Sequence, residues 1–456
     1  MADDTEGEQN VQSVADANVR TLGPGAEYRF ELEKGSNLTI KLVEGNAEVF
    51  GAELAEGRPY VFWAECKACV FTWHGCKLEV TGQASTEYIS EETSMAPILN
   101  LHLLLEQMRI RAHRSSNGTP SDDDKKPEKS SNPPRVLVVG PENSGKTTAA
   151  KVLLNYAVRS PAEWQPILVN LDTSDGGFTV PGTLSAAPLD SPILSSSPST
   201  TLGGTASTAP SAVSSSALMP ITYWFGYPEP KKSPAVMEQR IKDLSARIRE
   251  RQQLDQFGYT SGIIIDTGAS FSLASPFTHS DHKYPLIQWA VEAFDVNVIV
   301  VIGHEKLNVE VQRLFNQASS SAAITVVKIP KSGGVVEVDH AYKERVISHQ
   351  ILSYFYGSHQ FLPQDVTDVH VETSLSPFSS DIGFDELLIY RIGGESIAPS
   401  SALPIGSQAI VTELKPIRVD PGILGSGLSH TVLALLSPLE HETTGDHPRN
   451  PQMRRL

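Results

Sequence analysis

Hydrophobic and polar residues alternate along much of the first hundred positions of the chain. Residues 28–33, 38–42 and 47–50 show this period of two, and turn-forming residues at 34–37 separate the first two segments. Alternation places apolar side chains on one face of a strand, and short strands divided by turns are typical of β-sandwiches and barrels. We therefore predict a small β-sandwich domain that reaches about residue 96.

The pattern becomes helical at residues 97–108, where apolar side chains recur every three or four positions. We interpret this segment as a helix that tethers the next domain, so that residues 21–113 form an N-terminal β domain with its helix. Residues 1–20 are acidic and polar with few aromatic side chains, which indicates a disordered arm.

A third pattern extends over residues 135–357, where uninterrupted apolar runs alternate with helical segments. The runs occupy residues 136–139, 167–171, 262–266, 298–302 and 324–327. Strands that are buried on both faces of a parallel sheet have this composition. The segment is therefore predicted to be an α/β domain, with a parallel sheet between helices.

Two segments have a low-complexity composition. Residues 114–134 are polar and rich in turn formers, which predicts a linker, and residues 191–217 are rich in Ser, Thr, Pro, Ala and Gly, which predicts a disordered loop inside the α/β domain. Lys125 and Lys126 fit part of a nuclear-import signal or, as we favour, a solvated mixed-charge linker.

The C-terminal part, residues 358–456, again contains short apolar segments broken by glycine and proline. Residues 386–391 and 409–412 are the clearest of them. We predict a small β-rich C-terminal domain.

The chain has 456 residues and a formal charge of −16, from 37 basic and 53 acidic side chains. At roughly 150 residues per domain, this length predicts about three domains. The acidic total disfavours broad adhesion to nucleic acid, although a local basic groove is compatible with it. The apolar runs are shorter than the ~20 residues that span a bilayer, and no secretory signal pattern begins the chain, so we expect a soluble protein that is not secreted.

Three cysteines, Cys66, Cys69 and Cys76, argue against a disulfide-stapled scaffold and favour a reducing compartment, cytosol or nucleus. Cys66 and Cys69, with His74 and Cys76 nearby, also fit a zinc site. We disfavour zinc, because the distant second ligand pair is missing and the segment alternates like a strand.

The strongest chemical signal is the sequence from Gly140 to Thr148, GPENSGKTT, which matches G-x-x-x-x-G-K-[ST] between a predicted strand and a predicted helix. Its glycines let backbone N–H groups turn inward, and the helix N-terminus adds positive potential, so the loop is suited to bind phosphates. The nucleotide-binding residues predicted here are Asn143, Ser144, Gly145, Lys146, Thr147 and Thr148. Lys146 would neutralise the β- and γ-phosphates, and the Thr147 hydroxyl would bind Mg²⁺.

Two aspartates follow buried strands and so belong at the same edge of the sheet as this loop. Asp172 follows residues 167–171, and Asp266 ends residues 262–266. Either carboxylate could organise Mg²⁺ or act as a base, and either could instead be a helix cap or turn former. We assign Asp172, with Thr147, to the metal and, if the protein is an enzyme, Asp172 to catalysis. A guanine-reading N-K-x-D segment is absent, so ATP is expected rather than GTP.

Several segments together, in this order, resemble the Clp-type polynucleotide 5′-hydroxyl kinase family, and especially its fungal branch in mRNA cleavage and polyadenylation. These are residues 47–54, 71–76, the phosphate loop, and residues 154–159, 181–183 and 330–337. The resemblance implies an N-terminal β domain, a central P-loop kinase-like domain and a small C-terminal domain. It also implies that Glu27 and Lys67 approach the adenosine of ATP, although both also fit ordinary exposed strand residues.

The chain departs from active members of this family in three places. The glycine-glutamine segment expected after Asp172 is absent, and Ala269 follows Gly268 where active members carry a tryptophan that clamps the RNA end. The lid segment, residues 337–345, keeps only Lys343 and Arg345 where active members place several arginines. Loss of one base–aromatic stack costs about 1–3 kcal/mol, and a missing arginine can cost roughly 10³–10⁵ in rate.

We therefore expect an ATP-binding, catalytically inactive kinase-like subunit of the nuclear pre-mRNA 3′-end cleavage and polyadenylation complex, with ATP as a structural ligand. The resemblance implies subunits of cleavage factor IA as partners, especially the one with a domain that binds the RNA polymerase II tail, and contact with pre-mRNA mainly through the complex. The alternative is an active ATP-dependent RNA 5′-hydroxyl kinase, and a generic P-loop ATPase is a third, less supported possibility.

Overall fold

The structure is a computed structural model that describes residues 18–63, 65–116, 132–198, 202, 220–274, 283–316, 324–356, 381–392, 416–423, 426–428 and 431–435. The described residues group into two compact units. One contains residues up to Val49, Glu53–Thr93 and Ser196–Pro198, and the other contains Phe50–Ala52, Ser94–Ser195 and the described residues from Leu202 onward.

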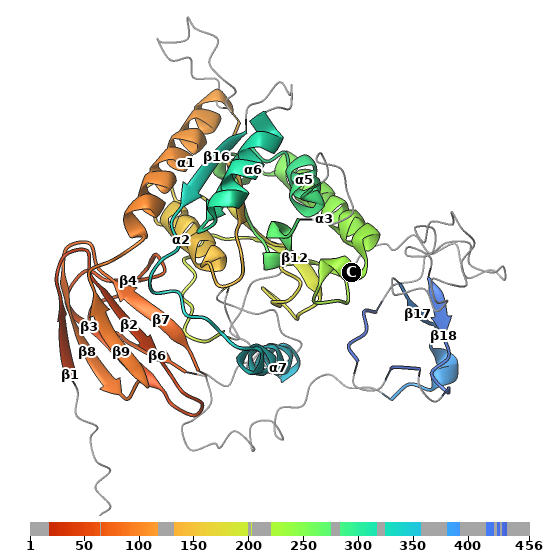
Figure 1. Ribbon diagram of the computed structural model, residues 1–456, viewed down its shortest axis with the longest axis horizontal. Coiled ribbons are helices and arrows are strands. Elements are labelled where there is room, and N and C mark those ends of the chain that lie inside the picture. The colour runs from red at the N-terminus through yellow and green to blue at the C-terminus, as the bar shows by residue number, and fades with distance from the viewer. Residues whose placement is uncertain are drawn as a thin grey trace, which may run out of the picture. The chain divides into compact units, whose positions relative to one another are not determined.

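The first unit consists of two antiparallel sheets, as the alternating sequence predicts (Figure 1). One has the order β1-β8-β3-β6, and the other has the order β5-β4-β7-β2-β9. The strands are Asn18–Leu22 (β1), Glu27–Glu31 (β2), Leu38–Gly45 (β3), Glu48–Val49 (β4), Ala52–Glu53 (β5), Pro59–Phe62 (β6), Lys67–Phe71 (β7), Cys76–Gly82 (β8) and Thr86–Ser90 (β9). The inward-facing apolar positions, including Leu38, Ile40 and Leu42 on β3, are buried and form the core of this β-sandwich.

The second unit contains a seven-stranded sheet with the order β13-β12-β11-β14-β10-β15-β16. Its strands are Arg135–Val139 (β10), Ile167–Asn170 (β11), Thr183–Pro188 (β12), Ile221–Trp224 (β13), Ile263–Asp266 (β14), Val298–Ile302 (β15) and Thr325–Ile329 (β16). The five strands predicted from apolar runs are present and parallel. The sheet is nevertheless mixed rather than purely parallel, because β12 is antiparallel to β11 and to β13.

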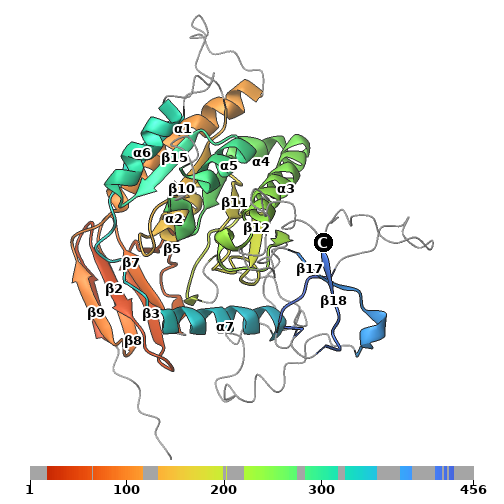
Figure 2. The ribbon, with the colours of Figure 1, turned by 45° about the vertical axis from the view of Figure 1, so that its right-hand side comes forward.

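Helices cover both faces of this sheet (Figure 2). The helices of the second unit are Met95–Ser116 (α1), Lys146–Val158 (α2), Pro234–Leu254 (α3), Gln256–Ser261 (α4), Pro285–Phe294 (α5), Glu305–Asn316 (α6) and His340–Tyr356 (α7). One continuous core joins α3 and α5 to alternate residues of the strands, such as Leu137, Val169 and Ile265. The intervening strand positions therefore face the other side, where α2 packs on β10 and β14.

Helix α1 is longer than predicted, and its contacts group it with the second unit. The fully buried Arg109 side chain donates through Nε to the Ser261 carbonyl at 2.9 Å. Glu106 accepts a hydrogen bond of 2.7 Å from the Trp164 indole. These polar contacts attach α1 to the segments that precede β11 and β14.

The segment that we predicted to be a disordered loop, residues 191–217, is described at its start. Residues 191–198 are described, and Ile193, Ser195 and Ser197 are buried. Asn155 fixes this segment, because its side chain accepts from Ile193 N at 2.7 Å and donates to Ile193 O at 2.9 Å. Burial and these hydrogen bonds override the low-complexity composition at its start, whereas residues 199–201 and 203–219 lie outside the described residues.

The described C-terminal residues include a two-stranded antiparallel sheet, Ile389–Arg391 (β17) with Ile417–Val419 (β18). The first strand overlaps the predicted segment 386–391, whereas 409–412 lies outside the described residues, as do most of the linker and the N-terminal arm. In the part of the chain that the structure describes, no helix has the length and apolarity needed to cross a membrane.

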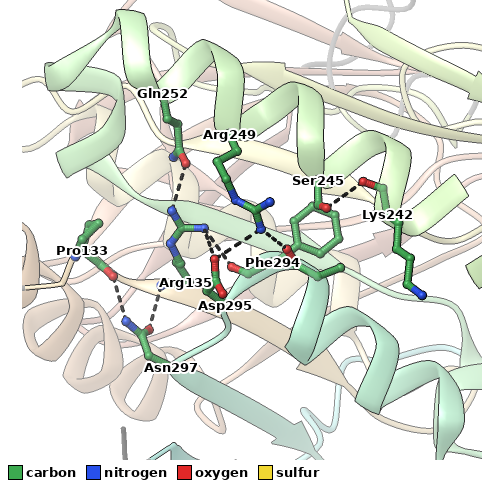
Figure 3. A network of polar contacts seen from close by, with 10 residues as sticks. Pro133, Arg135, Lys242, Ser245, Arg249, Gln252, Phe294, Asp295 and Asn297 are labelled. Atoms are coloured by element: carbon green, nitrogen blue, oxygen red, sulfur yellow. Dashed lines mark hydrogen bonds and ion pairs between the residues drawn. The ribbon is translucent and has the colours of Figure 1, made fainter. Parts of the chain in front are cut away.

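Arg135, the first residue of β10, organises the end of α5 (Figure 3). Its guanidinium donates to Phe294 O at 2.8 Å and to Gln252 Oε1 at 3.0 Å. Asp295 follows α5 with φ 52° and lies 3.9 Å from the Arg135 guanidinium, but its side chain is 64% exposed. The hydrogen bonds should therefore stabilise this corner more than the exposed ion pair does.

We expect Arg135→Met to lower the free energy of unfolding by about 1.5–3 kcal/mol, because it removes charged hydrogen bonds to a helix carbonyl and to a buried amide. Asp295→Asn is the matched control. Asparagine tolerates the positive φ, so this change should cost less than about 1 kcal/mol. Urea unfolding of both variants measures the difference. Equal losses of free energy of unfolding would show that the ion pair, rather than the hydrogen bonds of Arg135, stabilises this corner.

Candidate nucleotide-binding site

The loop between β10 and α2 has the backbone geometry of a phosphate nest. Asn143 and Gly145 adopt positive φ angles of 50° and 88°, and the Ser144 hydroxyl donates to Pro141 O at 2.8 Å. A Cβ on Gly145 would lie 3.2 Å from the Val335 side chain. Only a residue without a side chain satisfies both the backbone and the packing at position 145, which explains the glycine of the motif.

Lys146 is the first residue of α2, and its amine is directed back over the loop. Its Nζ donates to Pro141 O at 2.7 Å, and the side chain is buried. Burial lowers the pKa of Lys146, whereas the carboxylates of Asp266 and Asp172 oppose this shift. The amine therefore lies among the loop, the helix N-terminus and two acids, where a phosphate bound in the nest would meet it.

Thr147 is hydrogen-bonded to Asp266 rather than to the aspartate that we had paired with it. The Thr147 hydroxyl donates to Asp266 Oδ2 at 2.6 Å, and Asp266 is the buried last residue of β14. A hydroxyl and a carboxylate are oxygen ligands of the kind that Mg²⁺ prefers. The pair fits a magnesium ion held with ATP. This contact favours Asp266, our other candidate, over Asp172 as the partner of Thr147 at the metal.

Asp172 lies at the same edge of the sheet, directly after β11. Its carboxylate accepts hydrogen bonds from Ser174 N at 3.0 Å and from Ser174 Oγ at 2.6 Å. A Cβ on Gly268 would be 2.7 Å from Asp172 Oδ1, so the carboxylate rests against the backbone that follows Asp266. Burial raises the pKa of Asp172, and the hydrogen bond from Ser174 opposes the rise. The structure thus brings Asp172, Asp266, Lys146 and Thr147 together.

Burial raises the pKa of Asp266 to about 7, with the hydrogen bond from Thr147 opposing the rise and the charge of Asp172 adding to it. The native ligand-free protein should hold this proton from about pH 4 to 7, whereas the unfolded chain does not. The contribution of Asp266 to the free energy of unfolding should therefore fall as pH rises through this range. Asp266→Asn should remove that part of the pH dependence, which urea unfolding at several pH values measures.

The same proton should be released when Mg²⁺ binds, because a metal ligand must be deprotonated. Below pH 7, Mg·ATP affinity is expected to rise with pH by up to about tenfold per unit. Titration calorimetry in two buffers of different ionisation heat reports the proton released. An affinity that is independent of pH, with no proton release, would contradict the assignment of Asp266.

Helix α7 and the segment before it contact two loops of this site. Lys343 forms an ion pair with Glu142 of the phosphate loop, but both side chains are more than a third exposed, so the pair contributes little stability. The buried Gln350 donates to Asp175 Oδ1 at 2.7 Å and accepts from Gly176 N at 3.2 Å. Gln350 therefore fixes the loop that follows Asp172. No sequence pattern indicated Gln350, because its partners lie more than 170 positions away along the chain.

The remaining predicted ligands lie in different places. Thr148 is partly exposed in the first turn of α2, beside Thr147. Glu27 is buried on β2 of the first unit, where it accepts hydrogen bonds from Arg29 and Thr93, so it is not an ordinary exposed strand residue. Lys67 on β7 forms an ion pair with Glu31. Contact of Glu27 and Lys67 with adenosine stays a prediction.

The cysteines considered for zinc lie on neighbouring parts of the first unit. Cys66 and Cys76 are buried, Cys69 is partly exposed on β7, and all are free thiols. Burial raises the pKa of Cys76 to about 11, which disfavours the thiolate that a metal would need. The described residues contain no cluster of three or more potential metal-binding side chains.

Three family signatures match successive parts of the chain. They are the N-terminal beta-sandwich domain of polyadenylation factor at residues 21–112, the mRNA cleavage and polyadenylation factor CLP1 P-loop at 140–357, and the pre-mRNA cleavage complex II protein Clp1 at 375–448. The second of these spans the phosphate loop and both Asp172 and Asp266.

Individual proteins give the same result. The chain is 52% identical over 424 residues to the mRNA cleavage and polyadenylation factor CLP1 of Laccaria bicolor, covering 92% of this chain and 85% of the relative. It is 33% identical to the factor of the same name from Botryotinia fuckeliana, covering 95% and 84%. A solved structure of the wild-type Clp1p–Pcf11p complex matches with a TM-score of 0.66 and 25% identity, covering 83% of this chain and 79% of that one.

Proposed function

Because the chain belongs to the family of CLP1 mRNA cleavage and polyadenylation factors, we propose that it is the ATP-holding, kinase-like subunit of a nuclear pre-mRNA 3′-end processing complex. The observation that carries this proposal is the intact phosphate nest, with Gly145, Lys146 and the hydrogen-bonded pair of Thr147 and Asp266. The chemistry of these groups suits a magnesium-bound nucleotide. ATP is then a structural ligand that stabilises the folded protein in proportion to its binding.

The residues around the nest favour retention of ATP over transfer of its phosphoryl group. The lysine of the lid segment, Lys343, is paired with Glu142 of the phosphate loop itself, which offsets the positive charge that it could direct to a transferring phosphate. Backbone packing against Gly268 and hydrogen bonds from Ser174 already hold the Asp172 carboxylate. The lid segment has few cations, and the Asp172 carboxylate is already held by its neighbours. Together these features argue for a site that does not transfer the phosphoryl group.

The partner that we infer is a Pcf11-type subunit of cleavage factor IA, the subunit with a domain that binds the RNA polymerase II tail. A matching solved structure is of a Clp1p–Pcf11p complex, which supports this choice. Other subunits of the complex would bring pre-mRNA to the assembly. A nuclear location follows from this role.

One observation keeps the kinase alternative open. Burial raises the pKa of Asp172, which suits a general base, and the carboxylate lies beside the residues that would hold magnesium and phosphate. The alternative reaction is transfer of the γ-phosphoryl group of ATP to a 5′-hydroxyl of RNA, with Asp172 accepting the hydroxyl proton.

An end-labelling assay separates the two functions. Purified full-length protein is incubated with γ-labelled ATP, Mg²⁺ and a 5′-hydroxyl RNA oligonucleotide, beside Lys146→Met and Asp172→Asn. We expect no label on RNA, although the wild-type protein retains ATP. Label that appears with wild type and is lost in both variants would establish the kinase and overturn the silent-site proposal.

A further inference from the structure

We propose that helix α7, His340–Tyr356, is a latch on the nucleotide site that sets how fast ATP enters and leaves. The latch controls the residence time of the nucleotide and leaves its affinity almost unchanged. This inference rests on the function proposed above, since it concerns the exchange of the ATP that the phosphate loop is proposed to hold. It gives α7 and Gln350 a role that requires no phosphoryl transfer.

The segment that leads from β16 into α7 covers the phosphate loop. A Cβ added at Gly145 would lie 3.2 Å from the Val335 side chain, so Val335 packs directly against the loop. Further along the chain, Lys343 of α7 forms an ion pair with Glu142 of the same loop. Lys146 is buried in this arrangement. We therefore expect a phosphate in the nest to exchange with solvent when this cover moves away.

Helix α7 also grips the loop that follows Asp172. The Gln350 amide donates to Asp175 Oδ1 at 2.7 Å and accepts from Gly176 N at 3.2 Å, so both ends of the amide are used. The Gln350 side chain is buried, and water cannot replace these hydrogen bonds while the helix stays in place. The helix thus holds the phosphate loop and the loop after Asp172 at the same time.

The loop that Gln350 grips is itself held to the sheet. Asp175 Oδ1 accepts a second hydrogen bond, from Gly177 N at 3.0 Å. The Asn170 amide donates to Asp175 O at 3.2 Å, and Asn170 is the buried last residue of β11. Because these contacts fix the loop, it cannot follow α7 when the helix moves. Opening must therefore break the hydrogen bonds of Gln350.

Apart from its polar contacts, α7 is attached weakly. Among its described side chains only Gln350 and Ser353 are buried, and both are polar. The apolar side chains in the middle of the helix are only partly buried: Val346, Ile347, Ile351 and Leu352. No other described helix or strand packs extensively on α7, which lies apart from the helices on the sheet (Figure 2). A helix normally buries an apolar face, so the position of α7 depends on polar contacts that can break and re-form.

These contacts predict an effect on rates rather than on affinity. The hydrogen bonds of Gln350 join protein to protein and use no atom of the nucleotide. The free energy needed to open the latch is therefore the same with ATP bound and without it. ATP passes the same open state on entry and on exit, so loss of the grip raises both rates by one factor. The ratio of the two rates, which is the dissociation constant, then stays constant.

A merely structural role of Gln350 predicts a different result. If Gln350 only shaped the loops around the phosphate, its loss would weaken binding. Dissociation would then become faster, whereas association would stay constant or become slower. Measurement of both rates therefore separates a latch from a structural support of the site.

The test is stopped-flow fluorescence of the full-length protein with Mg²⁺ and ATP that carries a methylanthraniloyl group. Association is followed at several nucleotide concentrations, and dissociation is followed after excess unlabelled ATP is added. Because Gln350→Ala removes two hydrogen bonds of a buried group, we expect both rates to rise about five- to a hundredfold. The dissociation constant should change by less than about threefold, since the two rates rise together.

Ser348→Ala is the matched control on the same helix. Ser348 is exposed, and its hydroxyl donates to Glu344 O within α7 at 2.9 Å. This replacement removes a hydrogen bond of the helix without touching either loop of the site. Both rates should therefore equal those of wild type, and an acceleration like that of Gln350→Ala would contradict the latch.

Asp175→Ala breaks the same grip from the other side, and so tests the latch even if Gln350→Ala does not fold. It removes the acceptor of the Gln350 amide and should also raise both rates. Combination of the two replacements should add no further acceleration, because both break one contact. Additive effects would contradict the latch, since Gln350 would then act through other groups.

The outcomes distinguish the latch from the function on which it rests. Wild type that binds the labelled ATP, with unchanged rates in Gln350→Ala or with faster dissociation alone, would overturn the latch and leave the ATP-holding function in place. Wild type that does not bind the labelled nucleotide or unlabelled ATP would overturn the proposed function, and the latch with it.

Discussion

Replacing Lys146 with methionine is expected to abolish the stabilisation of the protein by ATP. A ligand at a thousand times its dissociation constant adds about 4 kcal/mol to the free energy of unfolding. The Nζ atom of Lys146 lies over the phosphate loop, 2.7 Å from Pro141 O. No described contact brings another ammonium group of α2 to this loop. The variant should therefore unfold at the same temperature with and without Mg·ATP, whereas wild type should gain several degrees.

The matched control is Lys151→Met on the same helix. Lys151 is also buried, but its ammonium donates to Ser195 Oγ at 2.9 Å and lies 4.4 Å from the centre of the Phe50 ring. This change should lower stability in the absence of nucleotide but preserve the gain on adding ATP. A Lys146→Met protein that still gains stability with ATP would show that the loop binds phosphate without this lysine.

The second large effect is expected from Gly145→Ala. A left-handed backbone costs an L-residue about 1–2 kcal/mol, and the new methyl group would also press on Val335 at 3.2 Å. The loop can relieve this strain by turning its N–H groups away from the nest. ATP binding must then turn these groups back and restore the strain. We expect roughly five- to thirtyfold weaker ATP binding from the backbone cost alone, measured by titration calorimetry.

Gly57→Ala separates this effect from a general loss of stability. Gly57 has a similar φ of 76°, but nothing lies within 4 Å of a Cβ at that position, and the residue belongs to the first unit. Its replacement should cost a similar free energy of unfolding and leave the affinity of the protein for ATP unchanged. Equal ATP affinities of the two variants would mean that the geometry of Gly145 does not shape the nest.

The sequence predicted the parts of the fold that repeat a simple pattern. Runs of valine and isoleucine located the five parallel strands, because a strand covered on both faces needs apolar residues at every position. Strand β12, Thr183–Pro188, was missed because small and polar residues fill it, and β13 was missed because it follows a low-complexity segment. Both strands form by pairing with β11 and with each other, which no local pattern records.

The candidate site was likewise predictable only in part from the sequence. The phosphate loop was predictable because its glycines, lysine and threonine have fixed spacing and a direct physical reason. The choice between Asp172 and Asp266 as the partner of Thr147 depends on which carboxylate reaches the hydroxyl, and only the three-dimensional structure gives this contact. The positioning role of Gln350 likewise depends on a contact between distant segments.

The central claim is that ATP is a structural ligand for assembly, and partner binding as a function of nucleotide tests it most directly. Affinity for a Pcf11-type fragment is measured with full-length wild type and Lys146→Met, each with and without Mg·ATP. The account predicts that ATP tightens binding by wild type about five- to a hundredfold, and that Lys146→Met binds weakly in both conditions. If the variant and nucleotide-free wild type both bind the fragment as tightly as ATP-bound wild type does, the account is contradicted.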